Sequence, residues 1–132
     1  MSFLDRFKSF SAAPAVSDKW QRFEKPEAAD PLFQESARPA LIYKHSFACS
    51  ICTYSLMSLE RSLEQIMPHA DVYFVDVRAE RPVSNYIAGK SGVIHQSPQA
   101  ILLYKGKAYW HGSHGEVRAE PVLDSLNEIA DS

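Results

Sequence analysis

Cys49 and Cys52 are the only cysteines of the 132-residue sequence, and two residues separate them. A short apolar segment, residues 40–43, precedes the pair, and a segment with helical periodicity follows it. A Cys-x-x-Cys pair that follows a strand and opens a helix is typical of a thiol–disulfide exchange site. Metal sites use the same spacing, so the pair alone leaves both chemistries open.

Apolar patterns predict alternating strands and helices after residue 39. Runs rich in apolar, β-branched or aromatic residues predict strands at 40–43, 72–77, 99–104 and 107–111. Three-and-four spacing and breaking prolines predict helices at 49–67, 81–90 and in the C-terminal segment after Val117. This order predicts an α/β fold, βαβαββα, in which a four-stranded mixed sheet carries helices on both faces. The first two strands should be parallel, and the last two should form a hairpin that turns at Lys105-Gly106.

The N-terminal part is predicted to divide at residue 25. Residues 1–25 are expected to form a partly helical extension, with Trp20 as a packing anchor, and 26–132 the main domain. Helical spacing in the extension is carried by the apolar residues Phe3, Leu4, Phe7 and Phe10. This stripe either docks on the domain or contacts a partner or a membrane surface. A further helix is expected over 27–36, beginning at Pro26.

Charge and hydropathy exclude several classes of function. The formal net charge of −2 gives no electrostatic footprint for nucleic acid. No apolar run approaches the roughly 18 residues that a membrane span requires. Charged residues interrupt the N-terminal apolar segment, so a signal peptide is not expected. We therefore expect a cytoplasmic protein, in which a close cysteine pair is catalytic or metal-binding rather than a structural disulfide.

The predicted element order, with Cys-x-x-Cys opening the first helix, resembles the thioredoxin fold. In that fold a cis proline begins the third strand beside the cysteines, and Ser97-Pro98 stands at the matching position. More narrowly, the chain resembles the YtxJ-type bacilliredoxins, which are thioredoxin-like proteins of the bacillithiol system. The resemblance spans about residues 39 to 118 and is carried by four stretches, 42–46, 76–88, 95–99 and 113–115.

The two cysteines are expected to have different roles. Cys49 would lie at a helix N-terminus, where free backbone N–H groups and the helix dipole stabilise a thiolate, so we assign the attack to it. Cys52, one turn into the helix, would resolve the mixed disulfide. Members of the resembled family often carry serine at the second position. The presence of Cys52 therefore leaves open whether this chain follows a one-thiol or a two-thiol route.

Several further residues are candidates for substrate binding. Lys44 and His45 lie in the approach to Cys49, where either could stabilise the thiolate or a substrate carboxylate. The resemblance implies that the Ser97–Pro98 bond is cis, which would expose the Ser97 backbone to an extended thiol substrate. The alternative for Lys44 and His45 is that both are ordinary loop residues.

The last strand should return to the sheet edge that carries Cys49. There Ser113 and Glu116 match a capping box, and the exposed N–H groups of Ser113, His114 and Gly115 would suit the carboxylate of a small thiol. The alternative is a box that only caps a helix. Asp76 could transfer protons near Cys52, although such a residue more often ends a strand.

Metal binding is the rival chemistry for the cysteine pair. Four residues could be zinc ligands, the pair Cys49 and Cys52 and the pair His111 and His114. A full α/β segment separates the two pairs in the sequence. An iron–sulfur cluster shared across a dimer through Cys49 is a second alternative. We predict no bound metal or cofactor, and a low-molecular-weight thiol as co-substrate.

Together these features predict a cytoplasmic thiol–disulfide oxidoreductase. The resemblance implies that it removes bacillithiol, or a similar small thiol, from protein cysteines. Its partners would be thiolated proteins and the small thiol. The alternative is a non-catalytic redox sensor or adaptor of thioredoxin fold, which only the N-terminal apolar stripe favours.

Overall fold

The structure is a computed structural model of the chain, and it describes residues 16–132. The predicted N-terminal helix, with its apolar stripe, lies outside the described residues. Among residues 16–132, no helix combines the length and the hydropathy that crossing a membrane would require.

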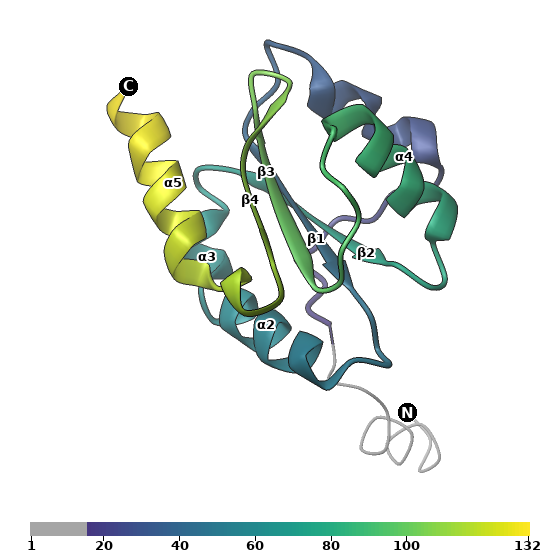
Figure 1. The fold of residues 1–132 in the computed structure, drawn as a ribbon. Helices are drawn as coiled ribbons and strands as arrows, with labels where there is room; N and C mark the ends of the chain where they lie inside the picture. The colour runs from purple at the N-terminus through teal and green to yellow at the C-terminus, as the bar shows by residue number, and fades with distance from the viewer. Residues whose placement is uncertain (1–15) are drawn as a thin grey trace.

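A four-stranded mixed sheet forms the centre of the fold (Figure 1). Its strands, in chain order, are β1 (Ala40–His45), β2 (Asp71–Asp76), β3 (Gln99–Tyr104) and β4 (Lys107–Ser113). Their spatial order is β2-β1-β3-β4. β1 pairs in parallel with β2, and β3 is antiparallel to both β1 and β4. The predicted mixed sheet, the parallel first pair and the closing hairpin are confirmed.

Helices cover both faces of the sheet, as expected (Figure 1). One face carries α2 (Ser50–Arg61), α3 (Leu63–Ile66) and α5 (Ala119–Asp131). The other carries the 3-10 helix η1 (Pro26–Phe33) and α4 (Arg81–Ser91). Gly92 ends α4 in the left-handed region, with φ 74°, a conformation that glycine adopts without steric cost.

Three predicted helices differ in detail from the structure. The helix expected at 49–67 is interrupted at Ser62, whose non-helical φ of −114° separates α2 from α3. The helix expected at 27–36 is the shorter 3-10 helix η1, because Pro31 lacks the N–H that a regular α-helix would use. The capping box of Ser113 does not start the C-terminal helix. It caps the single turn η2 (His114–Glu116), and α5 begins separately at Ala119.

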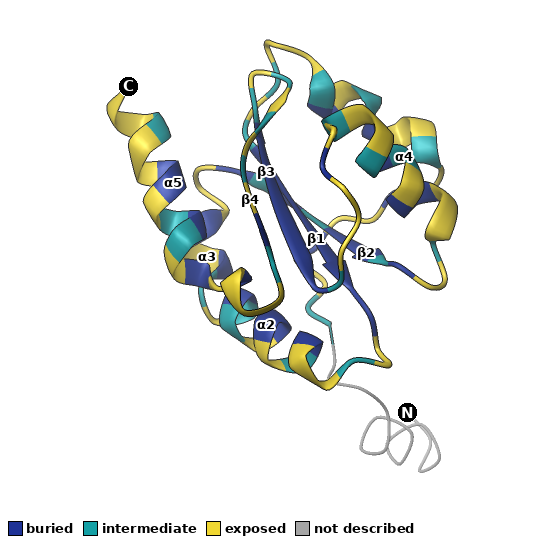
Figure 2. Cartoon of the chain, viewed as in Figure 1, coloured by how far each residue is buried: buried dark blue, intermediate teal, exposed yellow. Residues whose placement is uncertain are grey.

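β1 is buried along its whole length and separates two apolar cores (Figure 2). Side chains of a strand alternate between the faces of the sheet. Leu41 and Tyr43 therefore belong to the core beneath α2 and α5, and Ala40 and Ile42 to the core beneath α4. A strand covered on both faces tolerates apolar residues at every position, which explains the continuous apolar run in the sequence.

Residues 17–23 pack against the sheet although they precede the predicted domain boundary. Trp20 is buried, its ring lies 5.8 Å from that of Tyr43, and its Nε1–H donates to Glu60 Oε1 at 3.0 Å. Gln21 forms an isolated parallel bridge with Tyr73. The role of Trp20 as a packing anchor is confirmed, and the division at residue 25 stays a prediction.

The position of Trp20 allows a test of this packing. We expect Trp20→Ala to lower the free energy of unfolding by about 3–5 kcal/mol, because it removes a buried indole and leaves a cavity. Chemical denaturation under reducing conditions measures this loss. Lys19→Ala is the matched control, with an expected change within about 0.5 kcal/mol, because Lys19 is exposed. A loss of less than about 1 kcal/mol for Trp20→Ala would show that residues 17–23 contribute little to the core.

Candidate active site

Cys49 lies at the end of the connection between β1 and α2. A short bend over residues 46–48 follows the strand, and the Cys49 N–H donates to the Ser46 carbonyl at 3.2 Å. Cys49 is the N-cap residue of α2, with an extended backbone at φ −115° and ψ 119°. It is partly exposed, whereas Cys52 is fully buried one turn further into the helix. The sequence therefore places one thiol at the surface and the other behind it.

The two thiols have opposite pKa shifts. The pKa of Cys49 is lowered, mainly because the backbone N–H of Cys52 donates to its sulfur. The pKa of Cys52 is raised, mainly by burial. Since the thiolate is the nucleophile, Cys49 is the thiol prepared to attack, as expected from its place at the helix start. Cys52 stays in its thiol form while Cys49 is not bound in a disulfide.

Tyr43 joins the cysteine helix to the central strand. Its hydroxyl donates to the Cys52 carbonyl at 3.1 Å and lies 2.7 Å from His45 Nδ1. Because the hydroxyl has a single proton, His45 Nδ1 carries the hydrogen of the second contact. Burial raises the pKa of Tyr43 and lowers the pKa of His45 to about 4. Both side chains are therefore neutral at physiological pH.

The structure places the predicted binding residues of β1 on opposite faces of the sheet. His45 faces α2, where it is buried and its ring lies 4.5 Å from that of Phe47. Lys44 faces α4, where its Nζ donates to the Ser84 carbonyl at 3.0 Å and lies 3.4 Å from His95 Nδ1. Burial lowers the pKa of Lys44 to about 8. The fold therefore does not bring the Lys44 amine to the thiols.

The loop before β3 reaches Cys52 from the other side. The Ser97–Pro98 peptide bond is cis, as the resemblance implied. Ser97 Oγ lies 3.8 Å from Cys52 Sγ. The structure thus brings Ser97, which precedes Pro98, to Cys52 through a contact between side chains, which the sequence did not indicate.

The end of β4 also lies at this edge of the sheet. A pocket of about 240 Å³ separates the start of α2 from η2. It is lined by Ile51, Tyr54, Ser55, Ser58, His114, Gly115, Val117 and Arg118. Ser113 lies on the far side of β4, where its N–H donates to Glu116 Oε1 at 3.2 Å. Of the three residues predicted there, His114 and Gly115 face the cysteine helix.

Sequence reasoning missed Arg118 and the exposed apolar residues around Cys49. Phe47, Ile51 and Tyr54 are 44%, 42% and 74% exposed. A signal for the last two was present, because neither falls on the buried stripe of α2 that contains Leu56 and Leu59. Nothing in the sequence placed Arg118 beside α2, since that contact joins residues about 60 positions apart.

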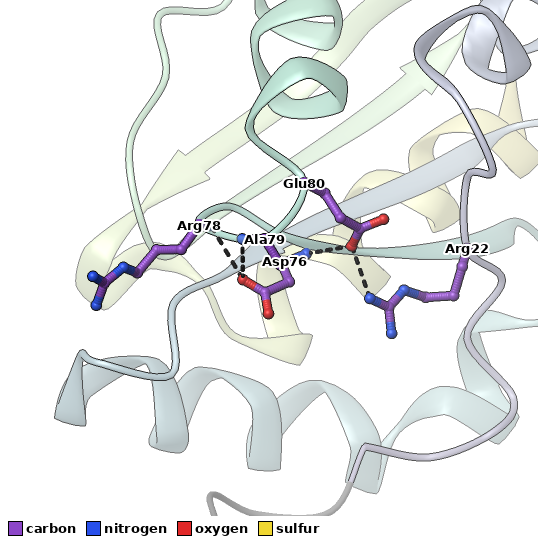
Figure 3. A network of polar contacts seen from close by, with 5 residues as sticks. All are labelled: Arg22, Asp76, Arg78, Ala79 and Glu80. Carbon is purple, nitrogen blue, oxygen red and sulfur yellow. Dashed lines mark hydrogen bonds and ion pairs between the residues drawn. The ribbon is translucent and has the colours of Figure 1, made fainter.

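Asp76 ends β2, and its side chain turns to the residues that follow the strand (Figure 3). Its Oδ1 accepts the N–H groups of Arg78 and Ala79, each at 3.1 Å. Its own N–H donates to Glu80 Oε1, which also pairs with Arg22 at 2.7 Å. These contacts fix the turn that leads into α4.

The residues considered for zinc are not gathered together. Among residues 16–132, no three or more His, Cys, Asp or Glu side chains are grouped so that they could hold a metal ion. His114 lines the pocket beside α2, and His111 lines a different pocket with Gln99 and Ser113.

The chain matches the model of a known protein family. The family model described as monothiol bacilliredoxin BrxC matches residues 21–122, which include both cysteines and the Ser97–Pro98 loop.

Solved structures give the same fold. A protein described as a candidate oxidoreductase with a thioredoxin fold is 26% identical, over 85% of this chain and 94% of the other, with a TM-score of 0.67. Chloroplastic thioredoxin z is 16% identical, over 89% and 100% of the two chains, with a TM-score of 0.66. The thioredoxin of Fasciola hepatica is 15% identical, over 82% and 97%, with a TM-score of 0.63. The expected thioredoxin-like fold is confirmed.

The opposite pKa shifts of the two thiols predict different alkylation profiles. In Cys52→Ser, Cys49 should react with iodoacetamide with a midpoint below the ordinary thiol value of about 8.5. In Cys49→Ser, Cys52 should react slowly and with a midpoint above that value, because burial disfavours its thiolate. Reactivity falls as the pH drops through each pKa, since only the thiolate reacts. Mass spectrometry of quenched samples measures both rates, and equal or reversed midpoints would contradict the assignment.

Proposed function

The chain belongs to the monothiol bacilliredoxin family, and on this premise we propose that it is a thiol–disulfide oxidoreductase that removes bacillithiol, or a similar small thiol, from protein cysteines. The observation that carries the proposal is the asymmetry of the two thiols: an accessible Cys49 with a lowered pKa, and a buried Cys52 with a raised one. We place the reaction in the cytoplasm, because a reducing compartment keeps such a pair available as thiols.

In the first step the Cys49 thiolate attacks the sulfur of the small thiol in a mixed disulfide with a substrate protein. A new disulfide forms between Cys49 and the small thiol, and the bond to the substrate protein breaks. The substrate cysteine leaves with the electron pair and takes up a proton from solvent. The N–H of Cys52 stabilises the attacking thiolate before the step, so the reaction starts from a prepared nucleophile.

Two routes complete the cycle. In the two-thiol route Cys52 attacks Cys49 Sγ and releases the small thiol, and the resulting Cys49–Cys52 disulfide needs two electrons from a thiol reductant. In the one-thiol route a second small-thiol molecule attacks the mixed disulfide, leaves as a small-molecule disulfide and frees Cys49. Cys52 distinguishes this chain from a strictly one-thiol protein, and we propose that it resolves the mixed disulfide.

The state of Cys49 controls when Cys52 can act. Besides burial, two effects of Cys49 raise the pKa of Cys52: the hydrogen bond between the two side chains and the negative charge of the Cys49 thiolate. Both contributions need a free Cys49 thiolate, and they disappear once Cys49 carries the small thiol. The pKa of Cys52 therefore falls at the moment when a second nucleophile is required.

The pocket between α2 and η2 suits the rest of a small thiol that bears a carboxylate. It opens beside Ile51, which stands between the cysteines, and His114 and Arg118 line it. A guanidinium binds a carboxylate through charge-assisted hydrogen bonds, and a small thiol attached to Cys49 would reach this pocket first. The exposed rings of Phe47 and Tyr54 then offer apolar surface to the substrate protein.

Cysteine variants test the reaction directly. On a protein carrying a bacillithiol mixed disulfide, Cys49→Ser should de-thiolate no faster than the Cys49→Ser/Cys52→Ser background, because it lacks the attacking sulfur. Cys52→Ser should complete the first step and accumulate a Cys49–small-thiol adduct. Intact mass spectrometry reports both species. De-thiolation by Cys49→Ser at the wild-type rate would refute the mechanism, and full activity of Cys52→Ser without added thiol would refute the two-thiol route.

The same assay with excess substrate separates the enzyme from a redox sensor. An enzyme supplied with a thiol reductant turns over many times. A sensor or adaptor reacts once and stops at a stoichiometric amount of product.

Arg118 provides a test of the carboxylate pocket. We expect Arg118→Gln to raise KM about fivefold for a substrate thiolated with bacillithiol, on the order of 1 kcal/mol for a partly exposed charged contact. KM for the same protein thiolated with uncharged mercaptoethanol should stay unchanged. Arg61→Gln, at the end of α2, serves as a control of equal charge. Equal effects of Arg118→Gln on both substrates would exclude carboxylate recognition by this residue.

A further inference from the structure

The sulfur of Cys52 is shielded from water and has few hydrogen-bond donors near it. Cys52 has no exposed surface. In the part of the chain that the structure describes, two groups can donate to its sulfur, the backbone N–H of Ser46 and the hydroxyl of Ser97, whose Oγ lies 3.8 Å away. In the thiol form either Cys52 or Ser97 can be the donor of this contact. Once the sulfur has lost its proton, the Ser97 hydroxyl must be the donor of this contact.

Contacts on the far face of the sheet hold Ser97 in this position. Two residues before Ser97, the Nδ1 atom of His95 lies 3.4 Å from Lys44 Nζ and 3.2 Å from Ser84 Oγ. Two residues after Ser97, Gln99 Nε2 donates to the Ile94 carbonyl at 2.8 Å and ties the loop to the start of β3. The loop is therefore fixed on both sides of Ser97, and the buried Lys44 amine is part of that support.

We propose that Ser97 is a catalytic residue of the resolving step, in which its hydroxyl donates a hydrogen bond to Cys52 Sγ while this sulfur attacks Cys49 Sγ. The electron pair of Cys52 forms the new bond between the cysteines, the bond from Cys49 to the small thiol breaks, and the small thiol leaves as a thiolate that solvent protonates. The mixed disulfide itself is the oxidant of this step. The inference rests on the proposed function, in which Cys52 resolves the adduct.

Ser97 thereby selects between the two routes of release. With the hydroxyl present, Cys52 can ionise although it is shielded from solvent, and it then attacks Cys49 Sγ. Without the Ser97 hydroxyl, a smaller fraction of Cys52 is ionised. The adduct on Cys49 then persists until a second molecule of small thiol attacks it. The share of two-thiol turnover therefore depends on a side chain outside the Cys-x-x-Cys motif.

Among residues 16–132, few other titratable groups face Cys52. Cys49 is uncharged while it carries the small thiol. Tyr43 contacts the Cys52 carbonyl and stays neutral because burial raises its pKa, and His45 behind it has a pKa of about 4. Of the groups named here that contact Cys52, only Cys52 itself is therefore expected to ionise between pH about 5 and 9. Lys44, whose pKa is about 8, acts on the Ser97 loop through His95 from the opposite face of the sheet.

An aromatic disulfide, dithiodipyridine, separates the two chemical steps without any bacillithiol. With one equivalent of this probe, Cys49 releases one thiopyridone in a first phase, and attack by Cys52 releases a second in a slower phase. We expect Ser97→Ala to lower the ratio of the second rate to the first about tenfold, which corresponds to about 1.4 kcal/mol. Ser97→Thr should restore the ratio to within about twofold, because it keeps the hydroxyl. The midpoint pH of the second phase should rise in Ser97→Ala.

Controls distinguish this effect from a general loss of structure. Ser125→Ala removes a buried serine hydroxyl from α5 and should leave the ratio unchanged. In the Cys49→Ser background, Ser97→Ala should also shift the alkylation midpoint of Cys52 upward, which needs no disulfide chemistry. An unchanged ratio in Ser97→Ala, or an equal slowing of both phases, would overturn the proposal. Failure of the proposed function gives a different result. In that case the protein releases thiopyridone in both phases but does not de-thiolate substrate proteins.

Discussion

The complete burial of β1 is the constraint on which the rest of the structure depends. The strand pairs on both sides, and its alternating side chains enter two different cores. Its C-terminal end must leave the sheet by a short bend, and this bend sets the position of Cys49 at the start of α2. The same alternation sends Tyr43 and His45 beneath the cysteine helix and Lys44 beneath the opposite one. One strand therefore supports both the thiols and the loop that faces them.

The chemistry of the site follows from a difference in burial between two thiols that lie one helical turn apart. At the first position of the motif, main-chain N–H groups are free and solvent is near, so a negative sulfur is stabilised. At the fourth position the same kind of thiol is enclosed and stays protonated. No charged side chain is needed to create this difference. Lys44 and His45, the ionisable candidates beside the motif, lie buried and contribute to packing and to hydrogen bonds instead.

Much of this arrangement could be predicted from sequence, and the omissions have physical causes. The periodicity of apolar residues predicted the order of strands and helices. The proline before the third strand matched a known fold, which predicted that Ser97 and Pro98 lie beside the cysteines. The predicted strand ends at residue 43, so the sequence did not show that Lys44 and His45 belong to β1 and point to its opposite faces. The contact between Ser97 and Cys52 and the pocket beside Arg118 join segments distant in the chain. Such contacts depend on tertiary packing, which local pattern does not encode.

Two of the contacts that secure position 52 are made by its main chain. The Cys52 N–H stabilises the Cys49 thiolate, and the Cys52 carbonyl accepts the Tyr43 hydroxyl. Both contacts remain available when serine stands there, and an oxygen in place of the sulfur would leave no large void. The number of thiols can therefore change during evolution by a single substitution that leaves these main-chain contacts in place. A family built on this fold is free to move between dependence on the cellular thiol pool and an internal resolving cysteine.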